Sequence, residues 1–175
     1  AGSIGSEIVR QIAVFKPRLI VLLDQAETPM HDLILRLKEH YPKQDFSSYL
    51  ADVRNIDRMK SMMDLYRPDI VFHAAAYKHV PLMEDNPTES IQANVLGTKN
   101  MADLSVRYGV SRFVMVSTDK AVNPTNVMGA SKRIAEIYVQ SLNRKQEIDG
   151  KVVTKFITTR FGNVLGSNGS VIPYF

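Results

Sequence analysis

The sequence predicts an α/β fold built on a doubly wound parallel sheet, and two observations support this. Short apolar runs alternate with longer amphipathic stretches along the chain, which is the pattern of strands joined by helices. The chain has 175 residues, 45% of them hydrophobic, which is enough for one domain with a substantial core. We therefore expect a single α/β domain.

The first half of the chain predicts three helix and strand pairs. The expected helices cover residues 6–15, 29–40 and 56–66, and the expected strands cover residues 18–23, 46–50 and 69–74. Lys16-Pro17 ends the first helix, because proline does not continue one. Met59, Met62 and Met63 recur at helical spacing, so we expect them in the core.

The second half predicts a long helix over residues 88–108, a strand over 112–117, a helix over 127–145 and a strand over 151–160. Gly109 is the expected C-cap of the long helix. No strand precedes the first helix, and no closing element follows the last strand. We therefore expect a fragment that lacks its first strand.

Composition excludes several classes of function. The net charge of +4 and pI of about 9.3 fit either a solvated basic surface or attraction of an anionic ligand such as a nucleotide. No basic stripe with interleaved aromatic residues is present, so we expect no nucleic-acid partner. The absence of cysteine excludes disulfides and thiolate metal sites, and we expect no metal. The longest apolar run, residues 19–23, is too short to span a bilayer.

The start of the chain carries a glycine pattern. In Gly2-Ser3-Ile4-Gly5 the glycines would let a pyrophosphate approach the start of the first helix, although an ordinary tight turn explains them equally well. Asp24 ends the next strand, nineteen residues beyond Gly5, where a carboxylate can bind both ribose hydroxyls of NAD. Alone, such an Asp is also a common turn residue. Together they predict an NAD-binding Rossmann fold, with NAD preferred over NADP.

Three further positions are candidates for cofactor binding. Asp52-Val53 follows a strand where an acid could meet the adenine amino group, although Asp52 also fits a helix N-cap. Ala74-Ala75-Ala76 leaves room for a ligand against the backbone, or allows close packing. Asn94 interrupts an apolar helix face, so it either bonds backbone as a buried amide or holds a water and orients Lys132.

Candidate substrate contacts lie in two loops. Lys78, His79 and Glu84 follow the fourth strand, where open α/β sheets bind ligands, although many polar loops bind nothing. Asn163 and the glycine- and serine-rich run at residues 166–170 could contact a sugar or pyrophosphate. A plain connection explains that run equally well.

The densest group of reactive side chains is Thr118-Asp119-Lys120, at the end of a predicted strand. Lys132 follows on the next helix, and Met128 lies one turn earlier on the same face. A thioether cannot lose a proton, so acid–base chemistry would fall to the hydroxyl, carboxylate and ammonium groups of residues 118–120. The alternative interpretation is a capped turn with a surface ion pair, and a methionine that fills the core.

These segments together resemble the extended short-chain dehydrogenase/reductase superfamily, which places a Ser or Thr after a strand and a Tyr-x-x-x-Lys pair on the next helix. More narrowly, the chain resembles the membrane-anchored nucleotide-sugar 4,6-dehydratases of bacterial capsule, O-antigen and protein-glycan synthesis. Residues 1–7, 73–81, 117–124 and 160–167 carry the resemblance. Met128 at the tyrosine position is itself a trait of this branch.

The resemblance implies an NAD-binding domain over residues 1–175, with parts of the substrate region at 77–84 and 161–175. It implies dehydration of a UDP-sugar, with UDP-N-acetylglucosamine most compatible and the C5 configuration retained. Thr118, assisted by Lys132, would take the C4 hydroxyl proton during oxidation by NAD. Lys120 would then remove the C5 proton, and a protonated Asp119 would protonate the departing C6 hydroxyl. These roles require a lowered pKa of Lys120, which burial and Lys132 favour, and a protonated Asp119, which burial favours and the adjacent ammonium groups oppose; the sequence leaves that balance open.

The resemblance also implies a cytoplasmic segment without membrane contact, in a parent protein anchored at the cytoplasmic face of the bacterial inner membrane. The helices that begin near residues 88 and 127 commonly pair between subunits in this superfamily, which suggests a homo-oligomer. Three alternatives stay open: a C5-inverting dehydratase, a UDP-sugar epimerase, and a dinucleotide-binding module without catalysis.

Overall fold

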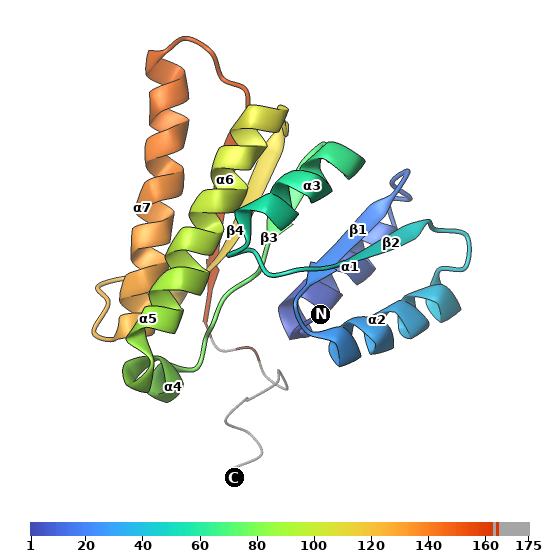
Figure 1. Ribbon diagram of the computed structural model, residues 1–175, viewed down its shortest axis with the longest axis horizontal. Coiled ribbons are helices and arrows are strands. Elements are labelled where there is room, and N and C mark those ends of the chain that lie inside the picture. Colours follow the sequence, from blue (N-terminus) through green and yellow to red (C-terminus); the bar gives the residue numbers. More distant parts are fainter. Residues whose placement is uncertain (163, 165–175) are drawn as a thin grey trace. The chain divides into compact units, whose positions relative to one another are not determined.

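The computed structural model describes residues 1–162 and 164, and Figure 1 shows the arrangement of the elements. The described residues form two compact units, residues 1–52 and residues 53–162. Each unit contains parallel strands joined by helices. The predicted α/β class with parallel strands is therefore confirmed.

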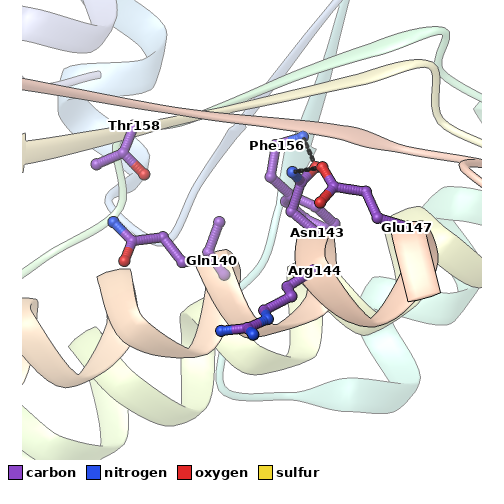
Figure 2. A pocket seen from close by; sticks show the side chains of 7 residues that line it. Gln140, Asn143, Arg144, Glu147, Phe156 and Thr158 are labelled. Carbon is purple, nitrogen blue, oxygen red and sulfur yellow. Dashed lines mark hydrogen bonds between the residues drawn. The ribbon is translucent and has the colours of Figure 1, made fainter.

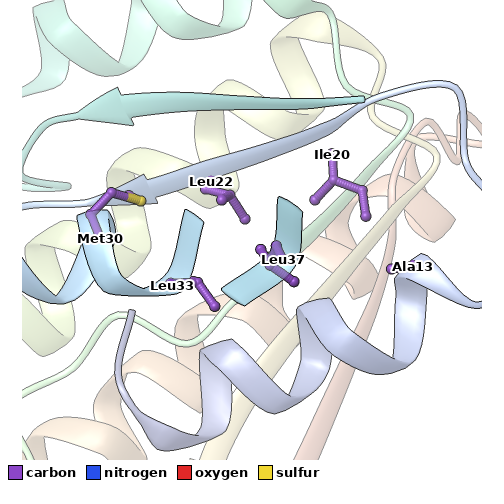
Figure 3. Close-up of a cluster of buried hydrophobic side chains, with 6 residues drawn as sticks. All are labelled: Ala13, Ile20, Leu22, Met30, Leu33 and Leu37. Carbon is purple, nitrogen blue, oxygen red and sulfur yellow. The ribbon is translucent and has the colours of Figure 1, made fainter. Parts of the chain in front are cut away.

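The first unit contains two helices and a two-stranded parallel sheet. Its elements are α1 (Ser3–Ala13), β1 (Ile20–Asp24), α2 (Glu27–His40) and β2 (Phe46–Leu50). The register runs from Ile20 opposite Phe46 to Asp24 opposite Leu50. Figure 3 shows its core, in which side chains of α1, β1 and α2 meet: Ala13, Ile20, Leu22, Met30, Leu33 and Leu37. Ile20 and Leu22 share one face of β1 because strand side chains alternate.

The second unit contains a three-stranded parallel sheet in the order β3-β4-β5. The strands are β3 (Ile70–His73), β4 (Arg112–Thr118) and β5 (Lys155–Phe161). The helices are α3 (Ile56–Tyr66), α4 (Val80–Asp85), α5 (Pro87–Ser90), α6 (Gly97–Tyr108) and α7 (Val127–Ile148). A π-helical segment, η1 (Ile91–Leu96), joins α5 to α6, and a 3₁₀ turn, η2 (Asp119–Ala121), follows β4. In Figure 1, α6 and α7 run side by side along this sheet.

The core of the second unit lies between the sheet and these helices. Phe113 and Met115 of β4 have no exposed surface, and Met59, Met62 and Met63 of α3 are also buried, as the sequence predicted. Gly97 allows close packing at the start of α6, because a Cβ there would lie 2.6 Å from a Val53 methyl carbon. Gly109 ends α6 in the left-handed conformation with φ of 73°, which confirms the predicted C-cap.

Four predicted elements differ from the structure. The first helix covers Ser3–Ala13 instead of residues 6–15. The long helix over 88–108 is interrupted by the π-helical segment, and α4 occupies most of the predicted loop over 77–84. The last strand begins at Lys155 instead of residue 151. There, the Gln146 side chain of α7 accepts hydrogen bonds from the backbone N–H groups of Val153 and Thr154, both 2.9 Å long, so this stretch is bound to the helix.

Candidate functional site

The predicted catalytic residues lie at the carboxyl end of β4, the edge at which open parallel sheets bind ligands. The register places Thr118 beside Phe161, so the segments after β4 and β5 leave the sheet together. A Cβ at Gly162 would lie 3.5 Å from Asp119 Oδ2. The sheet therefore brings residues 118–120 and 161–162 to one place.

Asp119 is the hydrogen-bonding centre of the 118–120 turn. Thr118 Oγ1 donates to Asp119 Oδ1 over 2.8 Å, and the Lys120 backbone N–H donates to the same oxygen over 2.9 Å. Lys120 Nζ lies 3.3 Å from it. Hydroxyl, carboxylate and ammonium groups are thus in direct contact, as proton transfer among them requires.

The protonation state of Asp119, which the sequence leaves open, follows from its surroundings. Its side chain is 57% exposed, and the hydrogen bond from Thr118 lowers the pKa of Asp119, with further lowering by Lys120. The carboxylate is solvated and accepts hydrogen bonds that favour its charged form, so Asp119 is ionised in this structure. The Lys120 side chain is 34% exposed, so the pair is not enclosed.

Lys132 and Met128 are both buried on the inner face of α7. Lys132 Nζ donates to the Val116 carbonyl of β4 over 2.9 Å. Burial lowers the pKa of Lys132 to about 8, and the negative charge of Glu136 opposes this shift. The lysine is therefore held against β4, two residues before Thr118.

Gly129 explains how α7 approaches the 118–120 turn so closely. A Cβ at this position would lie 2.2 Å from the Lys120 carbonyl oxygen, which no side chain tolerates. Asn126 caps the helix by accepting a hydrogen bond of 2.8 Å from the Gly129 N–H. The glycine thus permits the close approach of α7 to the 118–120 turn, a role that was not predicted from the sequence.

Asn94 lies in the π-helical segment and has no exposed surface. Its Oδ1 accepts from the Tyr77 N–H over 2.8 Å, and its Nδ2 donates to the Tyr77 carbonyl over 3.1 Å and to Ser131 Oγ over 3.0 Å. The amide thereby connects the loop after β3 to α7, next to Lys132. π-Helical segments often occur at functional sites.

His73, at the end of β3, is a buried titratable group whose hydrogen-bond partner could not be predicted from the sequence. Its Nε2 lies 2.9 Å from Thr98 Oγ1, and Thr98 donates to the Asn94 carbonyl over 2.6 Å. Burial, together with the charge of Lys132, lowers the pKa of His73 to about 3. The ring is therefore neutral, and it donates to Thr98.

The predicted substrate contacts have mixed positions. Lys78 and His79 lie in the loop after β3, and both are exposed. Glu84 lies on α4, and its Oε1 accepts a hydrogen bond of 2.7 Å from the Val127 N–H. Glu84 thus stabilises the start of α7, and its contact with substrate stays a prediction. Asn163 lies outside the described residues.

In the first unit, the glycine pattern is at the start of α1. Gly2 is the N-cap residue, and Ser3, Ile4 and Gly5 form the first turn. A Cβ at Gly2 or Gly5 would meet nothing within 4 Å, so the backbone borders open space there. A depression of about 300 Å³ lies beside this turn, lined by Ala1, Ser3, Ser6, Pro29, Asp32 and Arg36. An open helix N-terminus fits the pyrophosphate of a dinucleotide.

The acidic and small residues predicted for the cofactor also follow strands. Asp24 ends β1, where its Oδ1 accepts a hydrogen bond of 2.9 Å from the Ala26 N–H. Asp52 follows β2 but is not the N-cap of α3, because Asn55 has that position. Ala74-Ala75-Ala76 follows β3 directly. A carboxylate at a strand end fits a ribose, so these residues agree with a dinucleotide ligand.

A separate groove of about 460 Å³ lies between α7 and β5 in the second unit. Figure 2 shows side chains that line it: Gln140, Asn143, Arg144 and Glu147 of α7, and Phe156 and Thr158 of β5. None of the predicted site residues lines it. The groove is therefore distinct from the candidate catalytic site.

No helix in the described part of the chain combines the length and apolarity needed to cross a bilayer. Among the same residues, no group of three or more His, Cys, Asp or Glu side chains could hold a metal ion.

The chain is an extended short-chain dehydrogenase/reductase with an NAD-binding fold. The features that agree with this class are the parallel strands, the open start of α1 and the buried Lys132 beside β4. All 175 residues match the family described as "Polysaccharide biosynthesis protein", and the chain belongs to that family.

Two relatives are similar to this chain over almost its whole length. The chain is 53% identical over 175 residues to the capsular polysaccharide biosynthesis protein CapD of Staphylococcus aureus, covering 99% of this chain and 28% of CapD. It is 36% identical over 181 residues to a UDP-N-acetylglucosamine 4,6-dehydratase (inverting) of Campylobacter jejuni, covering 99% of this chain and 50% of that enzyme. The chain thus spans between a quarter and a half of the length of these relatives.

Two solved structures share the fold. Pen from Bacillus thuringiensis has a TM-score of 0.85 and 34% identity, with 99% of this chain and 51% of Pen covered. The UDP-glucose 4-epimerase of Thermus thermophilus, solved in complex with NAD, has a TM-score of 0.79 and 25% identity, with 95% and 54% covered. Both dehydratases and epimerases are therefore among the proteins that this chain resembles.

Proposed function

We propose that the protein is a nucleotide-sugar 4,6-dehydratase that converts UDP-N-acetylglucosamine to a 4-keto-6-deoxy sugar for surface polysaccharide synthesis. The observation that carries this proposal is the hydrogen-bonded turn of Thr118, Asp119 and Lys120, close to a buried Lys132 and a methionine. The turn supplies both an acid and a base, which an elimination requires. The similarity to the Campylobacter dehydratase supports the dehydration, although that enzyme is an inverting one and does not support retention at C5.

We assign NAD as the cofactor, which supplies a hydride acceptor and donor when bound. In the first unit, Gly2, Ser3, Ile4 and Gly5 would hold the pyrophosphate at the start of α1, and Asp24 would bind the adenosine ribose. Asp52 and Val53 are proposed for the adenine. In the second unit, Ala74-Ala75-Ala76 would border the cofactor, and Lys132 would bind the nicotinamide ribose, with Asn94 fixing the helix that carries it.

The ionised state of Asp119 suggests how a threonine can replace a tyrosine as the base at C4. A threonine hydroxyl alone is a poor base, but Thr118 donates directly to Asp119 over 2.8 Å. As the C4 hydroxyl loses its proton to Thr118 Oγ1, the threonine proton passes to the carboxylate. Asp119 thus begins as the proton acceptor of the oxidation and ends it protonated.

The elimination then uses the stored proton. Once Asp119 is protonated, the Lys120 ammonium loses a proton to solvent, and the neutral amine then removes the C5 proton, made acidic by the C4 ketone. The electrons of that C–H bond form the C5–C6 double bond. The C6–O bond breaks as Asp119 donates its proton, so water leaves and Asp119 returns to its charged form. Because Lys120 both removes and returns the C5 proton from one face, we propose that configuration at C5 is retained. The proposed substrate contacts are Lys78, His79, Glu84 and Asn163.

The experiment that tests this proposal incubates the full-length protein with UDP-N-acetylglucosamine without added reductant. Mass spectrometry should show loss of one water from the sugar nucleotide, and proton NMR should show an unchanged configuration at C5. An inverted C5 would identify an inverting dehydratase. A sugar of unchanged mass with inverted C4 would identify an epimerase, and unchanged substrate on protein that still holds NAD would favour a binding module.

A further inference from the structure

Glu136 is a fully buried carboxylate to which the proposed chemistry assigns no role. It lies on α7, one turn after Lys132, with no exposed side-chain surface. A carboxylate is expensive to bury unless it is paired and fully hydrogen-bonded. Its presence inside the second unit therefore calls for a physical reason.

Two arginines enclose this carboxylate. Arg160 of β5 binds it with both arms of the guanidinium group, Nε donating to Oε1 over 2.7 Å and Nη2 donating to Oε2. Arg133 Nη1 donates to Oε2 over 3.0 Å. Burial alone would raise the pKa of Glu136, but the arginines, with the Ser117 hydroxyl, lower it to about 2, so the group stays ionised.

The clamp formed by Glu136, Arg160 and Arg133 lies directly behind the catalytic turn. Arg160 pairs with Ser117 in the sheet register, and Ser117 immediately precedes Thr118. Lys132 Nζ donates to the carbonyl of Val116, the next residue back along β4. The clamp therefore joins α7 to β5 at the level of the lysine and of the 118–120 turn.

We propose that Glu136 is a positioning residue of this site. Held by Arg160 and Arg133, Glu136 fixes α7 against the strand ends, and its negative charge keeps the buried Lys132 protonated. This inference rests on the proposed function in one respect only, namely the role of Lys132 in the C4 oxidation. The clamp itself follows from the contacts. A protonated lysine is what would stabilise a nearby developing alkoxide, as the C4 oxidation demands.

Other charged and titratable groups also pack against α7 within the described part of the chain. Tyr138 of α7 donates to Asp103 of α6, and Lys99 of α6 lies over the Tyr138 ring. His73 of β3 couples electrostatically with Lys132 and stays neutral. Glu84 of α4 binds the N–H of Val127 at the first turn of α7, and the Asp119–Lys120 pair of η2 packs against the same end of the helix. Glu136 is the group whose charge acts directly against the burial of Lys132.

The test measures the titration of Lys132 in the full-length protein, without sugar substrate. Lysine labelled with ¹³C at Cε reports the charge of each amine by NMR, and the Lys132 signal is assigned by its loss in Lys132→Met. In Glu136→Gln the two arginines lose their counter-charge, so the midpoint of Lys132 should fall by about one pH unit or more. The control Glu147→Gln removes an exposed carboxylate from the same helix and should leave the midpoint unchanged.

A midpoint in Glu136→Gln equal to that of the wild type would overturn the proposal, since a purely structural role would alter melting but not this titration. If Glu136→Gln does not fold, Arg133→Gln replaces it, because the Arg133 side chain is 40% exposed. Removing this cation leaves Glu136 less neutralised, so the Lys132 midpoint should rise, and a midpoint that stays or falls would contradict the clamp. Because no turnover is measured, a failure of the dehydratase assignment would be seen separately, in the sugar assay.

Discussion

Among the single residues, the ionised Asp119 is the one on which the proposed proton relay depends. Its Oδ1 accepts hydrogen bonds from Thr118 and from the Lys120 backbone, and the hydrogen bond from Thr118 is the main cause of its lowered pKa. An acid that must donate at C6 therefore has to acquire its proton during the reaction. The contact with Thr118 provides the route.

We predict that Asp119→Asn lowers turnover of the sugar nucleotide by about 10²–10⁴-fold, because an amide can neither accept the relayed proton nor donate it at C6. Thr118→Val should impair the oxidation step to a similar degree, since it removes the relay hydroxyl. Asp64→Asn, an exposed carboxylate on α3, is the matched control and should retain turnover. Full activity in Asp119→Asn would exclude the relay.

A second residue-scale prediction concerns stability. His73 has a pKa of about 3 in the fold and an ordinary value of 6.5, so the unfolded chain binds a proton that the folded chain does not. The free energy of unfolding should fall as pH drops from 6.5 toward 3, by about 2 kcal/mol at pH 5 from this group. In His73→Gln that part of the acid sensitivity should disappear in denaturant titrations at pH 7 and pH 5. His79→Gln, at an exposed site, should keep the wild-type difference.

At the scale of elements, Gly129 controls the distance between η2 and α7. We predict that Gly129→Ala displaces the Lys120 backbone, because the new Cβ would lie 2.2 Å from its carbonyl oxygen. Turnover should fall more than 10-fold, about the effect expected for a misplaced catalytic group. Gln140→Ala, on the exposed face of the same helix, should change neither turnover nor melting temperature. A normal rate in Gly129→Ala would show that the close approach is dispensable.

The elements also show how far sequence reasoning extends. The bounds of α3 and β2 agree with the prediction because their periodicity is strong. The π-helical segment was missed because its cause is tertiary: Asn94 bonds Tyr77, seventeen residues earlier, and Ser131, thirty-seven residues later. The last strand was predicted too early because the Gln146 side chain binds the backbone at 153–154.

The same limit applies to the candidate site. The sequence predicted the 118–120 turn and Lys132 from their chemistry and spacing. It did not predict the clamp, because Glu136 reads as an ordinary charged helix residue until Arg160 is placed beside it by the sheet register. The available signal was the i, i+4 spacing from Lys132, which alone does not distinguish a buried carboxylate from an exposed one.

At the scale of the whole molecule, the outer surface of α7 suggests self-association. Ile134 and Ile137 are each about half exposed, although isoleucine is usually buried. Given the superfamily resemblance, we predict that a second copy of the chain covers them, so that Ile134→Glu with Ile137→Glu lowers the oligomeric state in analytical ultracentrifugation. Ile148→Glu, at the exposed C-terminal end of α7, should not. An unchanged sedimentation coefficient in the double variant would place any interface elsewhere.

The central claim is that one protein oxidises C4, expels water across C5 and C6, and returns the same hydride to C6. The most direct measurement uses UDP-N-acetylglucosamine carrying deuterium at C4, with the full-length protein and no external reductant. The account predicts that the product has lost one water and carries the deuterium in its C6 methyl group. Deuterium that remains at C4, or that is lost to solvent, would contradict it.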